Sequence, residues 1–301
     1  MSPDLNSEPP QADASIHHAV RSRLKLAGVI PAFNAAAVVT EAIDSLLHQT
    51  VPLDEIIVVD DGSTDDTASV AERTGVRVIR QTNGGPNMAR NTAIRATDAD
   101  WIFLLDADDV SYPERVAIQV RHLGDPKVGL LCGNAPEGSA MEITHALLWK
   151  RNQVITSSVA LRRRAWEDVG GFNESRTLIG AEDYNLWLRL TWRGWKVVRL
   201  DQPLARYQET ETSLTRQIDR CLRGELENVR LLREEFGLAI KDVRAKEHLV
   251  LLQYGLDTFH ERNFALARQY LGCASRLGSL SLPNYLRLWL SYLPALARHL
   301  P

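Results

Sequence analysis

The feature that most constrains the fold is an apolar run that ends in a cluster of carboxylates. Residues 101–105 read Trp-Ile-Phe-Leu-Leu, and Asp106, Ala107, Asp108 and Asp109 follow directly. A run of this kind predicts a strand buried on both faces, as in a parallel sheet. Because an unpaired buried charge is very costly, the carboxylates predict a cation partner, such as a divalent metal that carries a diphosphate. The alternative is a capped strand end, with Asp109 as the N-cap of the next helix.

Composition and charge narrow the class of protein. The chain has 301 residues, of which 45% are hydrophobic and 24% charged, so we expect one large α/β domain and a smaller appendage. The formal net charge of −3 gives no reason to expect a nucleic acid partner. Cys132, Cys221 and Cys273 show neither metal nor disulfide spacing, which favours small buried apolar side chains in a reducing compartment.

The N-terminal segment and the lengths of the apolar runs bear on location. Residues 1–23 are polar, lack the apolar core of a signal peptide, and are expected to form a disordered tail. No apolar run reaches the length of a membrane span. We therefore expect a cytoplasmic protein, and peripheral contact with the inner face of the cell membrane is left open.

Apolar runs and amphipathic segments alternate along the chain with short loops between them. This pattern predicts an α/β fold with a single, mostly parallel sheet flanked by helices. Pro31 predicts the C-terminal edge of the first strand, because proline cannot donate to a central ladder. The expected strands are 26–30, 55–59, 76–80, 101–105, 128–132 and 195–200, and the expected helices are 35–49, 87–96, 113–123 and 184–192, with one more that ends near 73.

Three polar clusters follow expected strands at the point where each strand ends. They are residues 31–34, Asp60 with Asp61, and residues 106–109. In open α/β sheets, ligands bind beyond the carboxyl ends of the strands. The sequence therefore predicts that these clusters, far apart along the chain, meet at one rim of the sheet.

Six segments carry a resemblance to a known family. They run from Val29 to Asn34, Val59 to Thr67, Asn83 to Asn91, Asp106 to Asp109, Gly170 to Glu174 and Ala181 to Trp187. In this order they resemble the successive motifs of family 2 glycosyltransferases. The resemblance covers residues 25–215 and implies a nucleotide-diphospho-sugar transferase fold of the GT-A type, with an inverting mechanism.

The resemblance implies a nucleotide-sugar site built from the first motifs. Pro31 and Phe33, with Ala32 and Asn34, would line the base and ribose pocket. Asp61, with Asp60, would accept hydrogen bonds from the base or the ribose, as carboxylates can. The alternative is a turn in which Ser63 or Asp65 caps the following helix.

The third and fourth motifs imply contacts with the diphosphate. Asp108, with Asp106, would hold Mg²⁺ or Mn²⁺, and Asp106 and Ala107 would also contact the nucleotide sugar. Arg90 would offer a cation to the diphosphate or support the acidic cluster. The alternative for Arg90 is a surface arginine on an amphipathic helix.

An inverting transfer needs a base opposite the leaving group. By the family pattern, Asp183 is that base and Glu182 assists in acceptor contact or positioning. Both precede a helical pattern, where the helix dipole favours carboxylates. The alternative is plain capping of the helix by the two side chains.

The sequence departs from the family pattern at one place. Many relatives have a histidine after the last strand, and here Gln208 or Thr210 lies near its place. If that histidine normally reaches the metal or the diphosphate, either contact is weakened. This keeps an alternative open, a catalytically weak or inactive nucleotide-sugar-binding relative that acts through its helical tail.

The last third of the chain is expected to be a helical extension. We predict a catalytic domain over residues 24–215 and the extension over 216–301, whose segment 283–300 is apolar and weakly basic. That segment predicts either an interfacial membrane helix or a helix that packs on the domain or on a second subunit, as in a homodimer. The expected partners are a UDP, GDP or dTDP sugar donor and a glycan or lipid-linked acceptor. The sequence names neither the sugar nor the acceptor.

Overall fold

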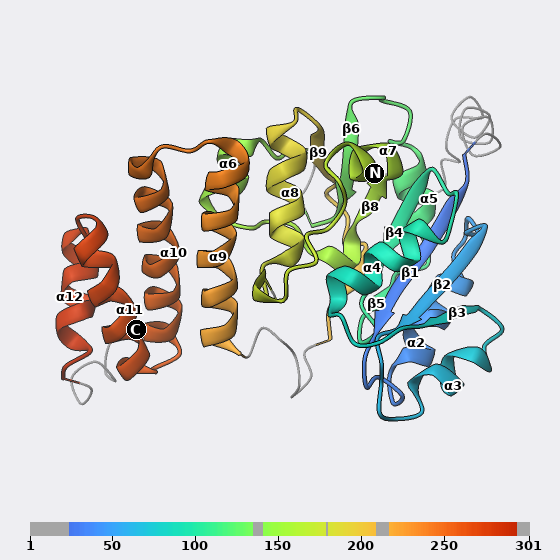
Figure 1. Cartoon of the computed structure of the whole chain (residues 1–301), viewed down its shortest axis with the longest axis horizontal. Coiled ribbons are helices and arrows are strands. Elements are labelled where there is room, and N and C mark those ends of the chain that lie inside the picture. Colours follow the sequence, from blue (N-terminus) through green and yellow to red (C-terminus); the bar gives the residue numbers. More distant parts are fainter. Residues whose placement is uncertain (1–23, 135–140, 179, 209–216, 294–301) are drawn as a thin grey trace, which may run out of the picture. The chain divides into compact units, whose positions relative to one another are not determined.

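The computed structural model describes residues 24–134, 141–178, 180–208 and 217–293 (Figure 1). Its backbone contacts divide the chain into two compact units. The sheet unit comprises residues 1–145, 153–172 and 186–210, and the helical unit comprises 146–152, 173–185 and 211–301. The expected disordered tail lies outside the described residues. The expected boundary at 215 also lies outside them, and a division there stays a prediction.

The sheet unit is built on one mixed sheet of the described residues, in the order β3-β2-β1-β4-β8-β6-β9-β7. The neighbours within β3-β2-β1-β4 are parallel, as are β6 and β9, whereas β8 and β7 run antiparallel to their neighbours. The mostly parallel sheet expected from the sequence is thus confirmed. The strands are β1 (Leu26–Ala32), β2 (Glu55–Asp60), β3 (Arg77–Arg80), β4 (Trp101–Leu104), β6 (Val128–Cys132), β7 (Met141–Glu142), β8 (Ala160–Arg162) and β9 (Lys196–Arg199), and β5 (Val110–Ser111) pairs separately with β10 (Ala205–Arg206).

Helices cover both faces of this sheet, because side chains alternate along each strand. On one face, Ile43 and Leu46 of α2 pack against Ile30 and Val58. The opposite face receives α4, which contacts β1 and β2 and crosses the front of the sheet in Figure 1. The helices of the sheet unit are α2 (Val39–Leu47), α3 (Thr67–Glu72), α4 (Pro86–Arg95), α5 (Arg115–Val120) and α7 (Arg163–Asp168), with a short 3₁₀ turn at Thr156–Ser158. Nearly all of α6 (His145–Lys150) and the 3₁₀ turn at Arg176–Leu178 belong to the helical unit, and α8 (Glu182–Trp192) is divided between the two units.

The prediction that Pro31 ends the first strand was wrong, since β1 continues through Pro31 to Ala32. The Val29 carbonyl accepts from the Leu105 amide on the β4 side, and residues two apart in a strand direct their backbone groups to the same side. The Pro31 nitrogen therefore faces β4, which has already ended at Leu104. Proline cannot donate the next ladder bond, so the pairing of β1 with β4 stops at Val29 and Leu104. The pairing with β2 on the other side continues to Ala32 and Asp60, so proline is tolerated inside this strand.

The helical unit has its own apolar core. Its main helices are α9 (Ile218–Phe236), α10 (Ile240–His260), α11 (Phe264–Leu277) and α12 (Leu282–Leu290). Leu222, Val250, Leu251, Tyr270 and Ala274 form the centre of the packing among them. Gly255 lets α10 and α11 approach closely, because a Cβ there would lie 2.8 Å from the Leu271 side chain.

A buried lysine lies in the helical unit beside this core. Lys246 of α10 is 2% exposed, and its Nζ donates to the Tyr184 hydroxyl at 2.9 Å. The Tyr184 hydroxyl in turn donates to the Leu148 carbonyl. Burial lowers the pKa of Lys246 to about 8, although the charge of Glu225 opposes this change. The lysine therefore ties α10 to α6 and α8 within this unit.

Candidate active site

The loops after β1, β2 and β4 leave the sheet at one rim. Parallel pairing places Ala32 opposite Asp60 and Val29 opposite Leu104. The Asp61 amide donates to the Ala32 carbonyl at 2.8 Å, so the β1 and β2 loops begin side by side. The structure thus brings together the three polar clusters that the sequence analysis expected at this edge.

The β1 and β2 loops are joined by hydrogen bonds. The Asn34 amide donates to the Ser63 hydroxyl at 2.9 Å, and the Asn34 side chain accepts from the Thr64 amide at 2.8 Å. Asn34 adopts a φ of 49°, a left-handed conformation that asparagine tolerates. Beside it, Phe33 is 51% exposed. The rim therefore presents an aromatic face on a loop with a fixed backbone.

Asp61 is buried and holds the loop before α4 by hydrogen bonds. Its Oδ1 accepts from the Gln81 side-chain amide at 2.7 Å and the Gly84 amide at 2.8 Å, and its Oδ2 accepts from the Gly85 amide at 2.7 Å. Both oxygens thus bind the loop before α4, and little accepting capacity remains for a base or ribose. The neighbouring Asp60 is also buried, and its Oδ1 accepts from the Ser63 amide at 3.3 Å.

Glycine favours the conformation of the loop before α4. Gly85 has a φ of 90°, and a Cβ on Gly84 would overlap the flexible Met88 side chain. A larger side chain at Gly85 would therefore strain the backbone, and one at Gly84 would require Met88 to move. This loop fixes the start of α4, the helix that carries Arg90.

Arg90 pairs with the acidic cluster. Its Nη2 lies 2.7 Å from Asp106 Oδ1, and the Arg90 side chain is only 5% exposed while that of Asp106 is 34% exposed. The guanidinium also lies over the Phe172 ring, 5.7 Å from its centroid. The alternative of a surface arginine was wrong. Arg90 forms an ion pair with Asp106 from the buried side and leaves part of the Asp106 carboxylate exposed to solvent.

Asp108 and Asp109 are the rim carboxylates whose pKa values are raised. Burial and the charge of Asp106 raise the pKa of Asp108. Burial also raises the pKa of Asp109 to about 6, although hydrogen bonds from Ser157 and Gln208 oppose this. Because α5 starts at Arg115 after Glu114, Asp109 does not cap that helix, and this alternative was wrong.

Gln208, one of the two residues near the place of the absent histidine, contacts the acidic cluster through its main chain. The Gln208 amide donates to Asp109 Oδ1 at 2.9 Å, and the Gln208 side chain reaches Glu41 at 3.4 Å. Thr210 lies outside the described residues. The acidic cluster is therefore held from this segment by a backbone N–H, to which the identity of the side chain contributes nothing.

The carboxylates of the rim have the donor chemistry that a divalent metal needs in a phosphate-binding site. Within the described parts of the chain, no group of three or more His, Cys, Asp or Glu side chains could hold a metal ion. Mg²⁺ in phosphate-binding sites typically takes one or two carboxylates and completes its shell with phosphate and water. Asp108 and Asp106, whose charges oppose each other, fit that smaller requirement, because a cation beside them would offset the repulsion.

Glu182 and Asp183 form the first turn of α8 and belong to the helical unit. Glu182 is buried, and its Oε2 accepts from the Gly180 amide at 2.6 Å. Gly180 has a φ of 98° and a Cβ there would lie 3.0 Å from Cys221, so glycine is required before this turn. The structure therefore fixes the local backbone on which the expected base is mounted.

A buried polar framework beneath the rim escaped the sequence analysis. Arg115 is fully buried, and its Nη2 donates to the Leu104 carbonyl at 2.9 Å and the Val159 carbonyl at 2.8 Å. Its Nε donates to Gln119, which donates in turn to the Ser158 carbonyl at 2.9 Å. Burial lowers the pKa of Arg115 to about 9, and the charge of Asp109 opposes this. Arg115 thereby fixes the strand end from which the acidic cluster projects.

A signal for this framework was present in the sequence. Arg115 and Gln119 are four residues apart on a helix and share a face with Val116 and Val120, which are buried. Polar residues on an apolar helix face are buried only when they are hydrogen-bonded.

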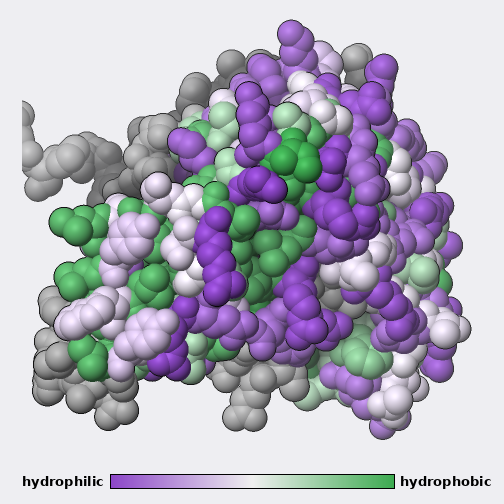
Figure 2. Space-filling model, turned by 60° about the vertical axis from the view of Figure 1, so that its left-hand side comes forward, coloured by the Kyte–Doolittle hydropathy of each residue, from purple (hydrophilic) through white to green (hydrophobic). Residues whose placement is uncertain are grey.

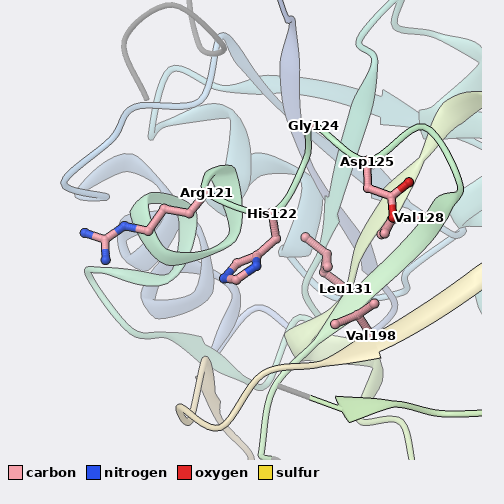
Figure 3. A pocket seen from close by; sticks show the side chains of 7 residues that line it. All are labelled: Arg121, His122, Gly124, Asp125, Val128, Leu131 and Val198. Atoms are coloured by element: carbon pink, nitrogen blue, oxygen red, sulfur yellow. The ribbon is translucent and has the colours of Figure 1, made fainter. Parts of the chain in front are cut away.

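A separate hollow of about 340 Å³ lies elsewhere in the sheet unit (Figure 3). Figure 3 shows Val128, Leu131 and Val198 at its floor, with the Arg121 side chain directed away. The residues that line it are Arg121, His122, Gly124, Asp125, Val128, Leu131 and Val198. None of these belongs to the predicted site, so the rim remains the candidate active site.

Known proteins resemble this chain in sequence over most of the described length. A family model described as glycosyl transferase family 2 matches residues 29–172, and one described as glycosyl transferase family group 2 matches residues 101–299. Chondroitin synthase of Escherichia coli is 31% identical over 199 residues, which cover 58% of this chain and 28% of that protein. An uncharacterized glycosyltransferase of Rickettsia felis is 36% identical over 185 residues, which cover 54% and 30%. The chain thus spans less than a third of the length of these relatives.

Solved structures share the architecture. A mannosyltransferase from Pyrobaculum calidifontis, in complex with GDP-Man and Mn²⁺, superposes with a TM-score of 0.61 at 19% identity and covers 95% of this chain and 93% of its own. S. aureus TarS in complex with UDP-GlcNAc gives a TM-score of 0.59 at 19% identity, with 91% and 87% covered. This likeness shows the fold, which is of the GT-A type. With the family match over residues 101–299, it follows that the chain belongs to the family 2 glycosyltransferases.

Proposed function

We propose that this chain transfers a sugar, with inversion, from a nucleotide diphosphate sugar to an acceptor hydroxyl, with the help of a divalent metal. The observation that carries the proposal is the rim, where the β2 loop, the β1 loop and the carboxylates that follow β4 come in this order along the edge of the sheet. An exposed aromatic, a glycine loop and paired carboxylates are what a base, a diphosphate and a cation each require. The related mannosyltransferase and TarS bind nucleotide sugars, which supports this donor class.

The donor is expected to lie along the rim. Phe33 would stack on the base, and Asn34 with the backbone of residues 31–34 would line the ribose. Asp61 contacts the nucleotide with at most its remaining lone pair, since its oxygens already hold the Gly84 loop. Its main contribution is then to keep that loop close to the diphosphate.

Asp108, with Asp106, would hold Mg²⁺ or Mn²⁺. Such an ion, when bound, supplies Lewis-acid stabilisation of the departing nucleoside diphosphate. Arg90 would add positive charge beneath Asp106 and keep that carboxylate oriented. Ala107 provides backbone between the two ligands at the place where the diphosphate would pass.

Asp183 would take the proton of the acceptor hydroxyl as its oxygen bonds to the anomeric carbon and the bond to the diphosphate breaks. Glu182, whose carboxylate holds the Gly180 amide, would position the turn that carries this base. The dipole of α8 favours the charged carboxylate before the proton is taken up.

The variant Asp183→Asn tests the base. We expect its transfer rate to fall by about 10² to 10⁴, because general base catalysis is removed. Binding of a nucleoside diphosphate with Mn²⁺, measured by thermal shift, should be unchanged. Asp242→Asn, which removes a carboxylate from the first turn of α10, is the matched control and should keep full activity. Turnover at the wild-type rate in Asp183→Asn would refute the assignment.

A second function, nucleotide-sugar binding without catalysis, is motivated by the absence of the family's histidine near Gln208 or Thr210. The backbone contact of Gln208 with Asp109 weakens this motive, because the segment still reaches the acidic cluster. Incubation with UDP-, GDP- and dTDP-sugars and Mn²⁺ separates the two functions. Hydrolysis or transfer of any donor excludes the binding-only protein, and tight binding with neither reaction would favour it.

A further inference from the structure

The helical unit leaves an apolar stripe exposed on its last described helix. Leu282, Tyr285, Leu286, Trp289 and Tyr292 follow the spacing of one helix face and are 47% to 84% exposed. Figure 2, in which this unit comes forward, shows green and pale residues gathered at the left of the surface. A contiguous apolar stripe of this kind marks a binding surface, since isolated exposed apolar residues are common but clusters are not.

The opposite face of α12 is anchored in the unit. Leu290 is buried against Phe259, Phe264 and Ala267, and Leu288 packs on the core formed by α9, α10 and α11. The helix is therefore held in place through one face, and the stripe on the other face is presented outward by a folded support.

The charged residues of the chain segment that carries the stripe have one sign. Residues 262–301 contain five arginines and no Asp, Glu or Lys, in a chain whose formal net charge is −3. Arg268 lies over the Tyr292 ring, 4.9 Å from its centroid, and Arg287 contacts Asn284 at 3.2 Å. Among the described residues, none of the arginines of α11 and α12 forms an ion pair with a carboxylate. A surface that combines unpaired positive charge with exposed Leu, Trp and Tyr is complementary to a negatively charged apolar boundary.

We propose that α12 docks the protein on the surface of a membrane that contains anionic phospholipids. Leucines would enter the boundary between headgroups and acyl chains, and Trp289 with the two tyrosines would lie at headgroup level, where amphipathic rings are favoured. The arginines would bind the phosphate groups of the lipids. None of the described helices has the length and apolar character needed to cross a bilayer. Because one face of α12 is packed in the helical unit, the helix would lie in the plane of the membrane surface with the stripe toward the lipid.

A second copy of the chain is the less favourable occupant of this stripe. In a two-fold symmetric dimer the same surface meets itself, so Arg268 and Arg287 of each copy would approach those of the other. No acidic side chain of α11 or α12 is available to pair with them. Like charges at an interface are unfavourable, whereas the headgroups of an anionic membrane supply the missing negative charge.

Flotation of the full chain with lipid vesicles tests the proposal and does not depend on catalysis. We expect retention on vesicles of phosphatidylglycerol and phosphatidylcholine, release at high salt, and little retention on phosphatidylcholine alone. The double variant Leu286→Ser, Trp289→Ser should lower the partition coefficient by about tenfold or more. Arg276→Glu with Arg287→Glu should do the same. Ile240→Ser, which changes an exposed apolar residue of α10, is the matched control and should bind like the wild type.

Circular dichroism of each variant establishes that it is folded, which is expected because none of the changed side chains is buried. Equal binding of wild type and Leu286→Ser, Trp289→Ser overturns the proposal, as does equal retention on neutral and anionic vesicles. Light scattering of the lipid-free chain gives the remaining outcome. A wild-type dimer that this double variant converts to a monomer would make the stripe a subunit interface and overturn the lipid assignment.

Discussion

At the scale of single residues, the rim depends on side chains that bind the protein itself. Asp61 directs both carboxylate oxygens to the loop before α4, and Arg115 holds the end of β4 from within the core. The role of neither side chain could be predicted from its residue type alone. A carboxylate that follows a buried strand, such as Asp61, can bind a ligand or a backbone amide equally well. Only the distances separate the two uses.

Asp61→Asn tests this interpretation. The amide would place an NH₂ group against at least one N–H donor, so a hydrogen bond becomes a repulsion and the free energy of unfolding should fall by about 1–3 kcal/mol. Urea denaturation measures the change. Asp66→Asn, at an exposed carboxylate of the same loop, should leave the free energy within about 0.5 kcal/mol of the wild type. If Asp61→Asn is as stable as the wild type but binds the nucleotide more weakly, Asp61 is a nucleotide-binding residue and not a structural one.

At the scale of elements, α10 and α11 approach closely at Gly255. A Cβ on Gly255 would lie 2.8 Å from the Leu271 side chain and 3.0 Å from the Leu271 amide nitrogen, so the helices would have to separate. The absence of a side chain at Gly255 therefore permits the packing of these two helices.

Gly255→Ala should therefore lower the free energy of unfolding by about 1–3 kcal/mol, as overpacking does. Gly272→Ala on α11 is the matched control, because a Cβ there meets no atom within 4 Å. That control should raise the free energy by up to about 1 kcal/mol through helix propensity. Denaturant titration of both variants is sufficient, and a stabilised Gly255→Ala would contradict the close packing.

Lys246 of α10 makes the free energy of unfolding depend on pH. Its pKa of about 8 in the folded protein lies below the ordinary value of 10.5, so the unfolded chain binds more protons between these values. The free energy of unfolding should accordingly rise with pH from about 8 to 10.5, and below pH 8 the buried lysine is destabilising. Lys246→Met removes this dependence, so the stability of the variant relative to the wild type should be highest below pH 8. It should fall by up to about 3 kcal/mol by pH 10.5. A difference that does not change with pH would show that Lys246 titrates normally.

At the scale of the whole molecule, the strands with apolar runs could be predicted and the contacts between distant segments could not. The runs that became β1, β2 and β4 are long enough to be recognised, and their order along the chain places their ends at one edge. β8 is only three residues long and is followed at once by α7, so no period could develop in the sequence. Within the expected helical extension, α10 and α11 are separated at Arg262, which has a φ of 63° and directly precedes Asn263, the N-cap of α11.

In the candidate site, too, local features could be predicted and contacts between distant segments could not. Residue types at strand ends were enough to place Asp60, Asp61 and Asp106 at a common rim. The burial of Arg90 and the framework of Arg115 and Gln119 depend on partners far away in sequence, such as Phe172, Val159 and Ser158. A single sequence contains no direct record of those partners. The roles of Asp108 and Asp183 stay predictions.

Metal dependence is a prediction for the intact protein. Addition of Mn²⁺ together with a nucleoside diphosphate should raise the melting temperature, because ligands that bind only the folded state stabilise it. EDTA should abolish the rise, and Asp108→Asn should reduce it strongly. Asp44→Asn, at an exposed position of α2, should behave like the wild type. A rise that survives EDTA would mean that the nucleotide binds without metal.

The amide of Gln208 donates to Asp109, and this contact has a consequence for inheritance. What comes from the main chain is supplied by nineteen of the twenty amino acids, because proline alone lacks the hydrogen. Substitutions at position 208 therefore leave the hydrogen bond to Asp109 in place, and the side chain could change during evolution without loss of this contact. Saturation of codon 208 should leave proline as the one outlier in folding yield.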